Sequence, residues 1–158
     1  MIFIKQYLLR LHTVISTLFL SKNQKLVKKW KKEHEQIVVL ATNVIGEYSK
    51  NNKIEAKKYL KKLNHLAVDH LMNEDIEFYK LLKDQKRLTP KNEIEVKEFT
   101  KTFKGTKMTL MGFLSKYTRE EAILDDTFFT AFNGLVEVLV ERIEFEESNL
   151  YSLLYAKG

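Results

Sequence analysis

Apolar residues recur in alternating steps of three and four along four long stretches of this chain, the spacing of helices that bury one face in a core. These stretches cover about residues 22–50, 54–83, 90–117 and, starting at Asp125 or Asp126, the chain to about residue 155. No alternating strand pattern competes with them, and the connections between them are short. The pattern therefore predicts an all-α fold, an up-down-up-down four-helix bundle over residues 21–158.

Local signals mark where these helices begin. Ser21, with Gln24 three residues later, has the pattern of a capping box. Asn51-Asn52 breaks the chain after the first helix, and Thr89-Pro90 supplies an N-cap followed by a first-turn proline. These signals agree with the periodicity and support the predicted boundaries.

Residues 1–20 form an additional segment whose apolar run, Leu8 to Leu20, is interrupted by polar residues such as Arg10 and His12. The run is too short and too polar for a membrane span, and it lacks a convincing cleavage site for a signal peptide. We expect an extra amphipathic helix. It remains open whether this helix packs on the bundle, pairs two chains as a homodimer or touches a membrane surface.

The composition limits the functions open to the chain. Its 158 residues are enough for one core, and the absence of cysteine excludes disulfides and thiol catalysis. No Ser-His-Asp arrangement, Gly-rich phosphate loop or CxxC motif is present, so we expect no enzymatic activity. Nothing indicates export, and we expect a cytoplasmic protein.

The net charge of +6 comes largely from lysines on the polar faces of two helices. These are Lys22, Lys25, Lys28, Lys29, Lys31 and Lys32 in the first helix, and Lys57, Lys58, Lys61 and Lys62 in the second. Lysine-rich faces of this kind are usually solvated surface, so no nucleic-acid partner is expected.

Polar residues interrupt the apolar stripes at one height of the predicted bundle. His34 lies on the first stripe, His70 and Glu74 on the second, and Arg142 and Glu146 on the fourth. His34 lies 17 residues before the break between the first two helices, and His70 lies 17 residues after it. At about 1.5 Å per residue, both lie about 25 Å from the same turn and face each other.

Two imidazoles and neighbouring carboxylates in a bundle core suit a borderline divalent metal such as iron, manganese or zinc. The spacing His70-x-x-x-Glu74 places both side chains on one helical face. A purely structural layer, in which the charged groups satisfy one another, explains the same residues.

The chain resembles the hemerythrin-like (HHE cation-binding) family over about residues 25–155. The resemblance is carried by His34, by the run His70-Leu-Met-Asn-Glu74 and by the run from Arg142 to Tyr151. In that family two irons share bridging carboxylates, and one iron takes a histidine from each of the first two helices. The other iron takes two histidines from the third helix and one from the fourth.

Carried over by position, the resemblance implies a complete ligand set for one iron only: His34, His70, Glu74 and Glu147. The three histidines of the second iron are absent. At that height the third helix offers only Phe103, Thr106 or Lys107, and the fourth helix has Arg142.

Arg142 is then expected to act as an internal counter-cation that bonds Glu74 and Glu147, with Glu146 as a supporting carboxylate outside the ligand set. This implies a metal-binding or sensor domain with one iron per chain, and not a dioxygen carrier that needs an iron pair. It equally allows a metal-free version of the domain.

A second resemblance points to a metal-free interaction module. Lys25-Leu-Val-Lys-Lys-Trp30 and Asn43-Val-Ile-Gly46 are similar to the opening helix of the regulator of sigma D family, and Arg142 with Glu146 suits its last helix. Those helical bundles bind a sigma factor, so this resemblance implies a protein partner held by the bundle surface.

Overall fold

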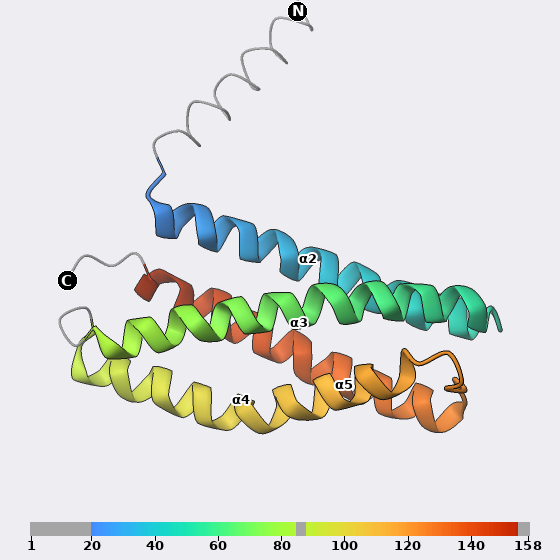
Figure 1. Cartoon of the computed structure of the whole chain (residues 1–158). Coiled ribbons are helices and arrows are strands. Elements are labelled where there is room, and N and C mark those ends of the chain that lie inside the picture. Colours follow the sequence, from blue (N-terminus) through green and yellow to red (C-terminus); the bar gives the residue numbers. More distant parts are fainter. Residues whose placement is uncertain (1–19, 85–87, 155–158) are drawn as a thin grey trace, which may run out of the picture.

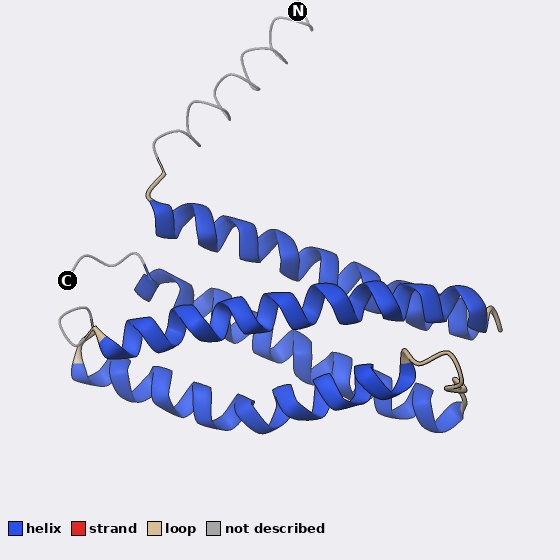
Figure 2. Cartoon of the chain, in the orientation of Figure 1, coloured by secondary structure: helices blue, strands red, loops and turns tan. Residues whose placement is uncertain are grey.

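The computed structural model describes residues 20–84 and 88–154. Within these ranges the chain forms four long helices and contains no strand, which confirms the all-α prediction (Figure 1, Figure 2). The helices are α2 (Lys22–Ser49), α3 (Lys53–Lys83), α4 (Pro90–Tyr117) and α5 (Asp126–Phe145). The helix expected at residues 1–20 lies, apart from Leu20, outside the described ranges.

The chain after α5 continues as a π-helical turn, η1 (Glu146–Leu150), followed by a 3₁₀ turn, η2 (Tyr151–Leu154). This differs from the sequence prediction of one α-helix to about residue 155. A π-helical turn contains more residues per turn than an α-helix, so it shifts the inward face of everything after it. Leu153, expected on the inward stripe, is half-buried, whereas Tyr151 and Leu154 are buried.

Side-chain caps begin the helices where the sequence signals place them. The hydroxyl of Ser21 accepts the backbone N–H of Gln24, and the Gln24 side chain accepts the N–H of Ser21 at 2.9 Å. Thr89 and Asp125 cap α4 and α5, each by accepting one backbone N–H of the first turn. Asn51 turns the chain between α2 and α3 with φ of 60°, a left-handed conformation that asparagine tolerates.

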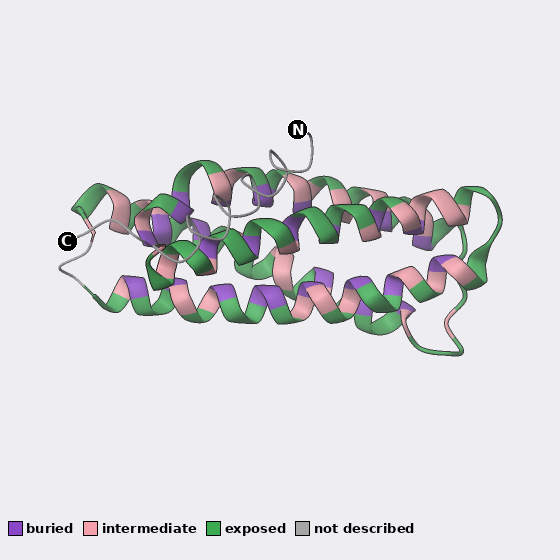
Figure 3. Ribbon diagram, turned by 90° about the horizontal axis from the view of Figure 1, so that it is seen from above, coloured by how far each residue is buried: buried purple, intermediate pink, exposed green. Residues whose placement is uncertain are grey.

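The four helices pack in pairs around a shared interior: α2 contacts α3 and α5, and α4 contacts the same two helices. Buried positions follow the inward face of each helix (Figure 3). None of the described helices is both long enough and apolar enough to cross a membrane.

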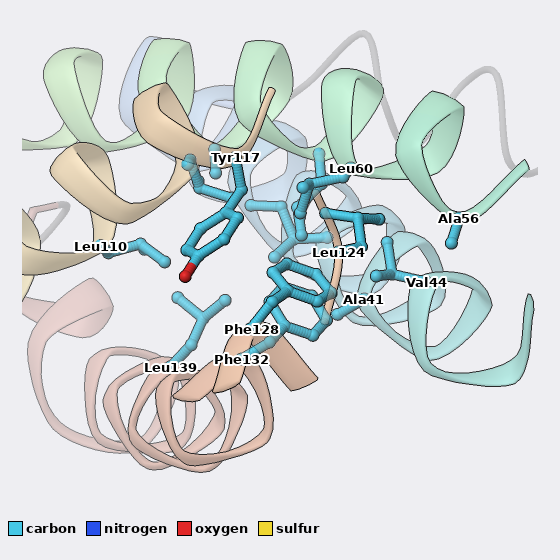
Figure 4. Close-up of a cluster of buried hydrophobic side chains, with 14 of the residues drawn as sticks. Ala41, Val44, Ala56, Leu60, Leu110, Tyr117, Leu124, Phe128, Phe132 and Leu139 are labelled. Atoms are coloured by element: carbon cyan, nitrogen blue, oxygen red, sulfur yellow. The ribbon is translucent and has the colours of Figure 1, made fainter. Parts of the chain in front are cut away.

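Polar residues divide the apolar core into two clusters along the helix axes. The larger cluster contains Phe128 and Phe132 of α5 together with side chains from α2, α3 and α4 (Figure 4). The smaller cluster contains Trp30, Phe78, Phe99 and Tyr151. Along α2, α3 and α5, the buried histidines, glutamates and arginine lie between the two clusters.

Phe128→Ala should lower the free energy of unfolding by about 3–5 kcal/mol, because a fully buried ring is replaced by a cavity. Four aromatic ring centroids lie between 5.0 and 6.0 Å from that of Phe128, so the site has little freedom to collapse. Urea unfolding measures the change. The control is Ile123→Ala, at a side chain 75% exposed, where a change above about 0.5 kcal/mol would contradict this assignment of the core.

Candidate metal centre

Five polar or charged side chains from α2, α3, α5 and η1 meet between the two apolar clusters. All five residues are almost fully buried, with exposed fractions of 2% for His34, 2% for His70, 0% for Glu74, 4% for Arg142 and 1% for Glu146. The structure thus brings together the two histidines that sequence spacing places at one height. We call these five residues the polar layer.

The two imidazoles of the polar layer face each other through Nε2. The two Nε2 atoms of His34 and His70 are 2.8 Å apart. Nδ1 of His34 lies 2.8 Å from Oε1 of Glu147, and Nδ1 of His70 lies 2.9 Å from Oε2 of Glu33. A carboxylate only accepts, so each Nδ1 carries the hydrogen, and each Nε2 is directed at the other imidazole. When both imidazoles are neutral, two Nε2 lone pairs face each other at this distance and repel. Either a hydrogen on one Nε2, which then donates to the other, or a metal ion bound beside the pair removes the repulsion.

The carboxylates of the polar layer are bonded to Arg142. Its Nη2 donates to Oε2 of Glu74 at 3.1 Å, and its Nε donates to Oε1 of Glu146. Oε2 of Glu146 lies 3.4 Å from Nε2 of His34. Oε2 of Glu74, the oxygen that Arg142 bonds, lies 3.9 Å from Nε2 of His70. Oε1 of Glu74 accepts the Tyr151 hydroxyl at 2.6 Å. Each carboxylate therefore joins Arg142 to the centre of the layer.

Burial and charge act differently on the two inner carboxyls. Burial raises the pKa of Glu74 well above its usual range, and the neighbouring Glu146 raises it further. Burial also acts to raise the pKa of Glu146, but contact with His34 and the charge of Arg142 outweigh it and lower that pKa. Of the two, Glu146 is the one held ionised. Glu74 is the member of the pair that holds a proton more readily.

Burial lowers the pKa of His70, although the hydrogen bond to Glu33 offsets part of that effect. The imidazole of His70 is therefore favoured in its neutral form, which is the form that ligates metals. Burial also acts against the charge of Arg142, but Glu146 and Glu74 outweigh it and raise the pKa of the guanidinium.

Two neighbouring glutamates, Glu146 and Glu147, have the reverse of the environments that the family resemblance implies. Glu146, expected outside the ligand set, is buried in the polar layer and bonded to Arg142. Glu147, expected as a ligand and as a partner of Arg142, has a side chain 30% exposed and contacts Nδ1 of His34. The carboxylate that contacts Arg142 therefore lies one residue earlier than the resemblance implies, on the apolar stripe of the fourth helix, which already contained Glu146.

Sequence reasoning missed two participants, Glu33 and Tyr151. Glu33 lies three residues after Trp30 and four before Ile37, at the edge of the buried stripe, and this spacing was the available signal. Tyr151 reaches the layer because the π-helical turn adds one residue between it and Glu146. No periodic pattern in the sequence indicates that turn.

The third helix supplies no ligand group to the layer. Phe103 packs against the guanidinium of Arg142, with 5.6 Å between the ring centroid and Cζ. Lys107 forms an ion pair with Asp75. Within the described residues, the atoms able to hold a metal are those of His34, His70, Glu74 and Glu146, whose donor atoms all lie within 4.8 Å of one another.

A small cavity of about 10 Å³ adjoins the polar layer, lined by residues that include His34, His70, Arg142 and Glu146. A volume of roughly 10–15 Å³ is the minimum that holds one water molecule. The space beside the two imidazoles is therefore of the size of one water or one ion.

Comparison of the chain with protein-family models, with curated protein sequences and with solved structures gives no match. The resemblances to the hemerythrin-like and regulator of sigma D families therefore remain expectations carried by the residues quoted for them. The geometry of the polar layer is the basis on which a function is inferred.

Arg142→Met should reduce the free energy of unfolding by about 3–5 kcal/mol near neutral pH, because it leaves two buried carboxyls without their cation. In the native chain the pKa of Glu146 lies below its ordinary value of 4.5, so its stabilising effect is present above that pH and lost below it. Without the charge of Arg142 the pKa of both buried carboxyls is higher than in the native chain, so the folded variant takes up a proton at a higher pH than the native chain does.

The difference in stability between the native chain and Arg142→Met should therefore shrink as the pH falls from about 8 toward about 5. Urea unfolding across this range measures it, with the exposed Arg119→Met as a control for loss of a positive charge. A difference that does not vary with pH would contradict the role of Arg142 as counter-cation.

Proposed function

We propose that this chain is a metal-binding helical domain that holds one divalent ion in the polar layer. More particularly, we propose a hemerythrin-like, up-down-up-down bundle with a single-iron centre that acts as a cytoplasmic sensor or binding domain. The ligands would be His34, His70, Glu74 and Glu146. The observation that carries the proposal is the pair of Nε2 atoms directed at each other across 2.8 Å.

The distances within the layer suit one metal ion. Two nitrogens that each lie about 2.1 Å from a metal, at right angles to each other, are about 3 Å apart, close to the observed separation. The whole donor set spans up to 4.8 Å, whereas opposite ligands of one ion at that bond length are about 4.2 Å apart. Binding therefore requires the layer to contract by about 0.6 Å.

The outer carboxylates provide the support that metal-binding histidines usually have. Glu33 and Glu147 each accept the Nδ1 hydrogen of one imidazole. Such a contact fixes the tautomer, directs Nε2 at the metal and makes it a stronger ligand. A buried imidazole without a metal also needs a hydrogen-bond partner, so these contacts suit the metal centre and the metal-free alternative alike.

The neighbouring groups limit what a bound ion does. An iron ion held in this centre would supply a redox-active site. Arg142 occupies the side of the layer where the resemblance places a second iron, and it neutralises one carboxylate charge. Tyr151 is within hydrogen-bond distance of His34 Nε2, at 3.1 Å, and its hydroxyl stays protonated because burial and Glu74 raise its pKa.

A second candidate is a metal-free interaction module, for which the regulator of sigma D resemblance is the specific form. The observation that favours it is the internal satisfaction of the layer. Within the described residues, Trp30 Nε1 is the single buried side-chain nitrogen or oxygen without a hydrogen-bond partner. A protein partner would then be recovered from cell extract whether or not metal is present.

Metal content distinguishes the single-metal domain from the metal-free interaction module. Untagged protein reconstituted anaerobically with ferrous iron should contain about one ion per chain by elemental analysis. His70→Asn should lose it, because a central nitrogen ligand is removed. His65→Asn is the matched control, since the His65 side chain is 85% exposed on the same helix and should leave the metal content unchanged.

Circular dichroism confirms that both variants are folded before their metal content is compared. No iron in the native chain, or equal iron in the native chain and His70→Asn, would contradict the proposed centre and favour the interaction module. Two ions per chain would contradict the single-metal form and require further ligands.

Arg142→His should raise the metal capacity above that of the native chain. The substitution removes the guanidinium from the place where the resemblance puts a second iron. It also supplies an imidazole at the position of the family's fourth-helix histidine. Iron per chain, measured as before, tests this expectation. An unchanged stoichiometry in a folded variant would show that Arg142 does not stand in for a second metal.

A further inference from the structure

A second, larger cavity of about 320 Å³ lies between α3 and α4. Its volume is within the roughly 300–1,000 Å³ of pockets that bind small molecules. The polar layer does not account for this cavity, since Arg142 is the one residue of the layer that lines it.

The walls of this cavity are aromatic. Phe78 and Phe99 are buried, with ring centroids 5.9 Å apart, and Phe103 extends the row at 4.7 Å from Phe99. Tyr79, 60% exposed, lines the side that opens to solvent. Rings arranged in this way favour stacked or edge-on contact with another planar, apolar group.

The charge around the cavity is positive. Lys104 and Lys107 both line it, and Lys107 is paired with Asp75. Lys104 is exposed and forms no ion pair with any described residue. One positive charge beside the aromatic walls is therefore uncompensated, which disfavours a cationic ligand and favours an anionic one.

The guanidinium of Arg142 lines the inner end of the cavity, with 5.2 Å between its Cζ and the ring centroid of Phe99. Its charge is already balanced by Glu74 and Glu146, which would repel an anion placed there. An anionic group is therefore favoured beside Lys104 and Lys107, with the apolar part of the ligand among the rings. No Gly-rich loop is available to hold a polyphosphate.

We infer that this cavity binds a small aromatic carboxylate, with its ring system among Phe78, Phe99 and Phe103 and its carboxylate beside Lys104. The site is separate from the metal ligands, so it does not depend on whether the polar layer holds an ion.

Calorimetric titration of the full chain with naphthalene-2-carboxylate tests this site. Naphthalene-2-carboxamide, which has nearly the same shape but no charge, is the control ligand. The carboxylate should bind more tightly than the amide. Lys104→Gln should weaken carboxylate binding about three- to tenfold and leave amide binding unchanged, because only the charge contact is lost. Lys101→Gln, at an exposed lysine of the same helix outside the cavity, should change neither.

Phe103→Ala should weaken the binding of both ligands, because it removes part of the aromatic wall. The thermal unfolding of this variant is first compared with that of the native chain to show that it is folded. Equal binding of carboxylate and amide, or equal effects of Lys104→Gln and Lys101→Gln, would overturn the proposed site. Octanoate that binds as tightly as naphthalene-2-carboxylate would overturn the preference for an aromatic body.

Discussion

The arrangement of the buried charges in the polar layer is the constraint on which the rest of this structure depends. Two carboxyls, one guanidinium and two imidazoles are removed from water at the level where three helices and the π-helical turn meet. Each charge is costly to bury alone, so every member requires the others in place. Helices that carry these residues cannot slide past one another without separating charges. The layer thus fixes the register of α2, α3 and α5, while the apolar clusters on either side supply most of the hydrophobic burial.

Much of the fold could be predicted from the sequence because its determinants are local. Helix boundaries follow from capping residues such as Ser21 and Thr89 and from the period of the apolar stripe, and both act within a few residues. The facing of His34 and His70 follows from two helices of known rise that leave one turn. The contact of Glu33 with His70 could not be predicted with the same certainty, because it depends on how two helices rotate against each other.

The exchange of Glu146 and Glu147 has a different physical origin. A one-residue difference in a family alignment is small, but on a helix it turns the side chain by about 100°. The apolar stripe predicted Glu146 in the core, whereas the family resemblance placed Glu147 there. In the structure Glu146 is buried, as the stripe predicted. For residues in a core, the amphipathic period is the stronger constraint, because a misplaced carboxylate must be buried without a partner or leave the core altogether. Tyr151 was missed because the π-helical turn breaks the period itself.

That turn makes the end of the chain one residue out of phase with α5. If residues 146–150 adopted α-helical geometry, the segment after them would rotate by about 100° and Tyr151 would leave the interior. The rotation would also move Leu154, whose carbonyl accepts the Asn23 side chain at the start of α2. The geometry of this turn therefore sets both the position of Tyr151 in the polar layer and the contact that closes the end of the bundle where α2 begins.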